Sequence, residues 1–248
     1  KDDTLPNRTK LVNPYTVTGE CERDNCYPTI VKNIFNINLV NDAACGGGVD
    51  RSIRKIYEYI ESQSLFNLKQ TIFFIELAPG VNRWDFYSNK LKNYLICNVN
   101  YTKDFEKITY LTENYLKPML IDEVYFNKFK SFLEEYHDLV WEWDEYQKDI
   151  RRKLLGLVSF FLQNKIEFFF SGDLNHIAGL ESIYPEITDR IFSYPTENRV
   201  YSDIMEFARE QKIRISDDLP GVADEHPGLY AHKVWGEEIA KFLNNKYL

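Results

Sequence analysis

The sequence is poor in cysteine and methionine and contains no long apolar run. Its 248 residues include 4 Cys and 2 Met. Four cysteines in a chain of this length do not make the disulfide framework of a small secreted domain. The most apolar stretches, LLGLVSFFL and IEFFF, are much shorter than the roughly 18–20 residues that cross a bilayer. We therefore expect no membrane span.

Lysine and arginine form no dense block, and the formal net charge is −8. A general nucleic-acid-binding surface needs a basic face, so we expect no nucleic-acid partner. Apolar and aromatic residues, in contrast, are plentiful, with 17 Tyr and 17 Phe. This composition disfavours disorder and suffices for the core of one large domain or two small ones.

The chain opens with the polar segment KDDTLPNRTK, which has neither an initiator Met nor the apolar centre of a signal peptide. We expect residues 1–248 to start inside a longer protein of the cytoplasm or of a virion. The segment CERDNC separates two thiols by four residues, with no second pair or nearby His. We interpret these cysteines as reduced, with a zinc site as the alternative, and expect no metal and no cofactor.

Three short apolar runs predict parallel strands. They are INLVN (residues 37–41), TIFFIEL (71–77) and IEFFF (166–170), and a continuous run such as TIFFIEL is typical of a strand buried on both faces. Apolar residues at helical spacing precede the first run, over residues 27–35, and follow it after Asp50, a good N-cap. This alternation predicts an α/β fold with three α/β/α layers around a parallel sheet.

The rest of the chain is expected to be mainly helical. Residues 105–115 and 121–164 carry helical patterns, whereas YLICNV (94–99) is a candidate strand. Four carboxylates near residue 145 are interpreted as a charged helix face rather than as metal ligands; they are Glu142, Asp144, Glu145 and Asp149. Helices at residues 200–211 and at the C-terminus follow. We interpret residues 1–248 as one domain in which residues 85–165 are largely an insertion.

Asp224 and His226 lie two residues apart in the loop before the C-terminal helix. A carboxylate can fix the tautomer of a histidine that acts as a general base and can stabilise the imidazolium formed. Pro227 suits the first turn of the helix that follows. The alternative is that Asp224 only caps this helix and that His226 is a surface residue.

Two further loops follow predicted strands and carry groups that can bind an anion. Gly46 opens a run of three glycines whose backbone N–H groups can face an oxyanion, or whose flexibility only serves a tight turn. The run lacks the G-x-G-x-x-G pattern of a dinucleotide site. Asn82 can donate an amide N–H, and Arg83 can bind a carboxylate or phosphate. Their alternatives are a turn residue and a surface charge.

The order of these segments resembles that of the SGNH (GDSL-type) hydrolases, most closely the divergent members of bacteriophages and marine bacteria. NDAACGGGVDRSIR (41–54) resembles the block in which Asn-x-Ala-x-x-Gly runs into an Arg-bearing helix. ELAPGVNRWDFY (76–87) resembles the third block, which carries the Asn of the family. DEHPGLYAHKVWGEEI (224–239) resembles the last block. The resemblance covers roughly residues 27–85 and 215–248.

The resemblance implies a flavodoxin-like parallel sheet and a serine ester hydrolase. It makes His226 the base, Asp224 the acid, Gly46 and Asn82 the oxyanion hole, and His232 a helix residue rather than the base. The family nucleophile is a Ser in a Gly-x-Ser turn after the first strand. Residues 1–248 contain no such turn, and SGD at residues 171–173 differs in order and place. We expect the first strand and the Ser to lie outside these residues.

The expected substrate is an acyl or acetyl ester, either small or carried on a glycan, and acyl transfer is a weaker expectation. The alternative function is a non-catalytic structural or carbohydrate-binding virion protein that has lost its nucleophile but keeps an SGNH-like core. Virion or oligomer partners are expected for this alternative. A Gly-x-Ser turn encoded upstream of Lys1 would favour the enzyme.

Overall fold

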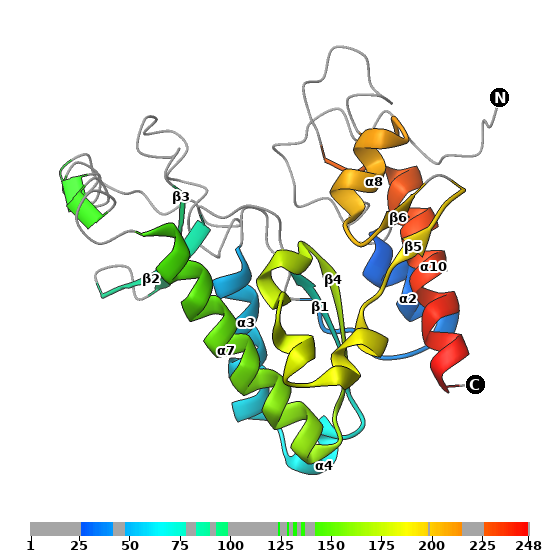
Figure 1. Cartoon of the computed structure of the whole chain (residues 1–248), viewed down its shortest axis with the longest axis horizontal. Coiled ribbons are helices and arrows are strands. Elements are labelled where there is room, and N and C mark those ends of the chain that lie inside the picture. Colours follow the sequence, from blue (N-terminus) through cyan, green and yellow to red (C-terminus); the bar gives the residue numbers. More distant parts are fainter. Residues whose placement is uncertain are drawn as a thin grey trace. The chain divides into compact units, whose positions relative to one another are not determined.

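The computed structural model describes residues 26–41, 48–77, 83–89, 93–98, 142–197, 199–214 and 226–247, with helical positions 124, 128, 131, 132, 135 and 136. These residues belong to two compact units (Figure 1). Unit 1 comprises Lys1–Asn41 and Phe192–Leu248, and unit 2 comprises Asp42–Ile191. The expectation of a single domain over residues 1–248 stays a prediction.

The centre of unit 2 is a pair of parallel strands, β1 (Ile72–Leu77) and β4 (Glu167–Gly172). They pair without a break from Ile72 opposite Glu167 to Leu77 opposite Gly172. Two of the three predicted strands and their parallel direction are therefore confirmed. The expected burial of both strand faces is met by β4 after its first residue, whereas β1 alternates between buried and partly exposed residues.

Two long helices, α3 (Val49–Ser62) and α7 (Trp143–Asn164), pack on one face of this strand pair (Figure 1). The core that joins them contains Phe73 and Ile75 of β1 and their register partners Phe168 and Phe170 of β4. On the helices, apolar residues at helical spacing supply the other half of this core; they are Val49, Ile53, Ile150, Leu154, Leu157, Val158 and Phe161. Each fully buried side chain of this size stabilises the unit by about 1.5–3 kcal/mol.

The first turn of α3 corrects one prediction. The N-cap of α3 is Gly48, whose carbonyl accepts the Ser52 N–H at 3.2 Å, and not Asp50. Asp50 instead lies in the first turn, where a carboxylate interacts favourably with the positive end of the helix. It also pairs with Lys153 of α7, with 2.7 Å between Nζ and Oδ1. This ion pair fixes the start of α3 against α7.

The remaining elements of unit 2 are short. The strands β2 (Arg83–Ser88) and β3 (Asn93–Asn98) form an antiparallel pair, which confirms a strand in YLICNV. One helical turn, α4 (Leu65–Leu68), precedes β1. Three 3₁₀ turns follow β4; they are η3 (Leu174–Ile177), η4 (Leu180–Ser182) and η5 (Pro185–Arg190). The predicted helix at residues 105–115 lies outside the described residues.

Unit 1 is built on α10 (Leu229–Tyr247), which packs against α2 (Tyr27–Phe35) and α8 (Ile204–Glu210). A small antiparallel pair, β5 (Tyr194–Pro195) and β6 (Val200–Tyr201), completes it. The side chain of Trp235 is fully buried and contacts Phe192 and Phe207, with ring centroids 5.1 and 5.6 Å away. The helix predicted at residues 200–211 begins only at Ile204, because Asp203 accepts the Met205 N–H at 2.7 Å and caps it.

Residues 37–41 are not a strand, and this prediction is wrong. Helix α2 ends at Asn36, which is left-handed with φ 51° and ψ 46°. The Ile37 N–H then bonds back to the Lys32 carbonyl at 3.2 Å, which is the Schellman end of a helix. Ile37 and Val40 are 44% and 63% exposed, so the segment lacks both the free N–H and the burial of a central strand.

The chain is thus a mixed α/β protein with a parallel pair of strands at its centre in unit 2. The three-layer, flavodoxin-like arrangement and the insertion at residues 85–165 stay predictions. Within the described ranges, no helix has the length and apolarity that a bilayer span requires.

Candidate active site

His226 lies at the entrance to α10, on a backbone that is fixed on its C-terminal side. The Gly228 N–H donates to the Ile213 carbonyl at 2.9 Å, and Pro227 forms an antiparallel bridge with Arg214. Pro227 and Gly228 are buried, whereas His226 itself is exposed. Pro227 therefore does not lie in the first turn of α10, as expected from the sequence, but anchors the loop that leads into it.

This arrangement suits a general base. A base must reach solvent or substrate with its imidazole while its backbone stays in place. The buried Pro227–Gly228 pair and the bridge to residues 213–214 hold the backbone, and the exposed imidazole of His226 stays accessible. The predicted partner carboxylate, Asp224, lies outside the described residues, so its hydrogen bond to His226 stays a prediction.

A second histidine, His232, lies one turn into α10. Its Nδ1 accepts a hydrogen bond from the backbone N–H of Tyr27 at 3.4 Å. The His232 and Tyr27 rings are stacked, with centroids 5.9 Å apart and an interplanar angle of 17°. Burial, and secondly the neighbouring His226 imidazole, lower the pKa of His232 to about 4. His232 is therefore neutral at pH 7.

Close packing of α2 on α10 fixes this contact. At Gly236, one turn beyond His232, an added Cβ would lie 2.9 Å from Ile30 Cβ and 3.1 Å from the Tyr27 carbonyl oxygen. Only glycine permits the two helices to approach so closely at this crossing. The sequence motif marks Gly236 as part of the last family block, but the reason for a glycine there emerges only from the packing.

The other predicted site residues do not enter the described geometry. Gly46 and Asn82 lie outside the described residues. Arg83 is the first residue of β2, and its side chain is not among those described. His226 belongs to unit 1 and the other three to unit 2. The oxyanion hole of Gly46 and Asn82 for the base His226, which the resemblance implies, therefore stays a prediction.

Three buried polar side chains of unit 2, on α3, α7 and η3, were missed by sequence reasoning. In unit 2, Arg51, Gln147 and His176 are 7%, 9% and 1% exposed, although polar side chains of these kinds are rarely so buried. The Arg151 guanidinium donates to the Asn175 carbonyl at 3.3 Å and ties α7 to η3 beside His176. A hint in the sequence is His176 itself, which ends the segment SGDLNH (171–176) after the apolar run of β4.

The acidic start of α7 is engaged in local structure. The Glu142 carboxylate accepts the Glu145 N–H at 2.6 Å and caps the helix. Asp149 pairs with Lys153 at 2.8 Å. Within the part of the chain that the structure describes, no three His, Cys, Asp or Glu residues are grouped so as to hold a metal ion.

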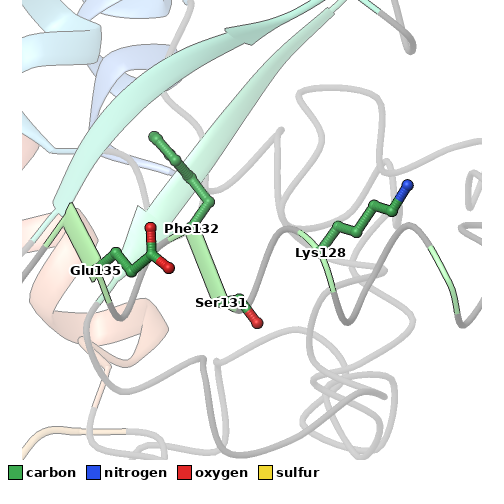
Figure 2. Close-up of a pocket in the computed structure, with 4 residues that line it drawn as sticks. All are labelled: Lys128, Ser131, Phe132 and Glu135. Atoms are coloured by element: carbon green, nitrogen blue, oxygen red, sulfur yellow. The ribbon is translucent and has the colours of Figure 1, made fainter.

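A shallow hollow lies on the helical positions near residue 130, as Figure 2 shows. It is lined by Lys128, Ser131, Phe132 and Glu135, which recur at intervals of three and four and so share one helix face. Phe132 is 45% exposed there. A single amphipathic face of this kind has no convergent groups for chemistry, and we assign it no role.

Comparisons with protein-family models, with curated proteins and with solved structures give no match to this chain.

Proposed function

We propose that residues 1–248 belong to an SGNH-type serine ester hydrolase whose general base is His226. The observation that carries this proposal is the setting of His226. His226 is exposed and follows Asp224 in an Asp-x-His-Pro sequence. The buried residues Pro227 and Gly228 come next and anchor the chain just before α10. Such a setting combines a fixed backbone with an accessible base.

The proposed reaction is the hydrolysis of an acyl or acetyl ester, either small or carried on a glycan. The Ser hydroxyl, supplied from outside residues 1–248, attacks the ester carbonyl while His226 takes its proton. Asp224 orients the imidazole, and the Gly46 N–H and the Asn82 amide stabilise the oxyanion. His226 then protonates the departing alkoxide, and water releases the acyl group. Arg83 would contact polar parts of the substrate.

The proposal includes the three-layer α/β/α fold of this family. In that arrangement β1 and β4 are neighbours in a longer parallel sheet, and α3 and α7 form one of its two helical layers. Ligands of such sheets bind at the carboxyl ends of the strands. A cytoplasmic or virion location is part of the same proposal.

The test is hydrolysis of short-chain p-nitrophenyl esters by the full-length protein and its variants. Without its base the Ser hydroxyl is a poor nucleophile, so His226→Ala should lower turnover by about 10⁴-fold. Asp224→Asn should lower it by a similar or smaller factor. Lys233→Ala, an exposed change on α10, is the control and should leave turnover as it is. Turnover that survives His226→Ala would refute the assignment of the base.

The alternative is a non-catalytic structural or carbohydrate-binding protein of a virion with the same core. The observation that favours it is the absence of a Gly-x-Ser turn from residues 1–248. The coding sequence upstream of Lys1 separates the two functions, because only the enzyme requires such a turn after an apolar strand. A full-length protein that is inert over a broad ester panel would support the alternative.

A further inference from the structure

His232 is held in a single tautomer. The Tyr27 N–H donates to Nδ1 at 3.4 Å, and the stacked Tyr27 ring keeps the imidazole in that orientation. A ring nitrogen that accepts a hydrogen bond carries no proton, so the proton of the neutral ring is on Nε2. His232 therefore presents Nε2–H as a donor.

The start of α2 keeps this imidazole neutral. Tyr27 is the first residue of α2, so its N–H is one of those that have no partner within the helix. An imidazolium would lose this hydrogen bond and would place a cation at the positive end of the helix dipole. A histidine that a helix N-terminus keeps neutral still donates a hydrogen bond through its protonated ring nitrogen, and this bond can polarise a carbonyl. The pKa of about 4 agrees with this geometry.

The Nε2–H donor of His232 lies toward the N-terminal end of α10, which is the end that His226 precedes. Side chains of an α-helix lean toward its N-terminus. The His232 N–H bonds to the carbonyl of Gly228, two residues after His226, at 3.1 Å. His232 is buried enough for its pKa to be lowered but is intermediate in exposure as a whole residue, and within the described ranges the hydrogen bond of its side chain is the one between Nδ1 and Tyr27.

We infer that His232 is a substrate-binding residue, whose Nε2–H donates a hydrogen bond to an oxygen of an uncharged ester next to His226. This inference rests on the proposed hydrolase function and adds to it a preference among substrates. Ester oxygens only accept hydrogen bonds, so they need a donor and no positive charge. Carboxylates and phosphates, in contrast, are bound best by cationic groups. The site should therefore favour neutral esters over anionic ones.

Two variants of the full-length protein separate this role from a purely structural one. In His232→Asn the amide oxygen takes the place of Nδ1, so the contact with Tyr27 is kept and the Nε2 donor is lost. In His232→Gln the amide nitrogen reaches the place of Nε2, so the donor is kept. We expect His232→Asn to lower kcat/KM for p-nitrophenyl acetate about tenfold, the effect of one neutral hydrogen bond, and His232→Gln to retain most of it. The thermal midpoints of both variants and of Lys233→Ala control for folding.

Equal kcat/KM for His232→Asn and the wild type would overturn the inference while leaving the hydrolase intact. Loss of activity in His232→Gln alone would also overturn it, because that pattern marks a structural role of Nδ1. A second measurement needs no activity: the ¹⁵N resonances of labelled histidine should show His232 protonated on Nε2 at pH 7. A proton on Nδ1 would refute the donor. A wild-type protein that hydrolyses no ester refutes the proposed function and this inference together, whatever the tautomer.

Discussion

Replacement of Gly172 by Ala tests the pairing of β1 with β4. Gly172 ends β4 with φ +96°, a backbone conformation that L-residues rarely adopt, and it lies opposite Leu77. An added Cβ would lie 2.2 Å from the Leu77 carbonyl oxygen. The obstacle is backbone and cannot rotate away. The same carbonyl accepts the Asp173 N–H at 2.8 Å, so any shift weakens this bond as well.

The magnitude follows from these contributions. The positive φ costs about 1–2 kcal/mol for a residue with a Cβ. The displaced carbonyl and its hydrogen bond add about 1–3 kcal/mol. Gly172→Ala should therefore lower the free energy of unfolding by about 2–5 kcal/mol, and a loss of this size is uncommon for a single substitution.

Gly179 supplies the matched control. Its φ is +89°, nearly that of Gly172, but an added Cβ would have no neighbour within 4 Å. Gly179→Ala should therefore cost only the conformational part, about 1–2 kcal/mol. Urea unfolding followed by circular dichroism compares the two variants through their midpoints. Equal destabilisation of both would show that Leu77 does not lie against Gly172 and would refute the strand pairing.

Three further predictions concern packing, helix ends and pH. Gly236→Ala should destabilise the protein by about 1–3 kcal/mol because of the clash with Ile30. Gly156→Ala in α7 should instead stabilise it by about 0.5–1 kcal/mol, because the nearest atom to the added Cβ is Tyr57 Oη at 3.4 Å. Calorimetry gives the sign of both changes in stability. Lys165→Gly should stabilise by about 0.5 kcal/mol, since Lys165 ends α7 with φ 56°, and an unchanged or lower melting temperature would contradict this. His232 has its pKa lowered to about 4 in the folded protein, so its unfolded form takes up a proton first as pH falls. The contribution of His232 to the free energy of unfolding should be highest above pH 6.5 and fall by at most about 3 kcal/mol between pH 6.5 and 4. His232→Asn should remove this part of the slope in urea unfolding at several pH values.

The strands of unit 2 could be predicted because their cause is local. TIFFIEL and IEFFF are continuous apolar runs, and they became β1 and β4 with the predicted parallel direction. The segment INLVN also carries apolar residues, but it includes two Asn and follows α2 directly. There the left-handed Asn36 turns the Ile37 N–H back to Lys32, so the end of a helix outweighs the propensity of the next residues for a strand. The composition of residues 37–41 alone does not predict that the helix end prevails over the strand.

The candidate site divides in the same way. His226 could be proposed as a base from the residues beside it, because Asp-x-His-Pro is a contiguous pattern, and this assignment stays a prediction. The neutral state of His232 could not, since it depends on the backbone of Tyr27, 205 residues away in the sequence. The burial of Arg51 and His176 likewise arises from packing of α3 and η3 within unit 2. Contacts of such sequence separation leave no periodic or compositional signal.

The two histidines and the core of unit 1 are coupled through α10. His232 lies three residues before the fully buried Trp235, which contacts Phe207, and Gly236 follows against Ile30. A change that rotates or shifts α10 by a fraction of an ångström moves the Nε2 donor and the loop of His226 together. Tightly packed interiors have few alternatives for such a helix. The aromatic core of unit 1 thus determines where the proposed donor of α10 lies.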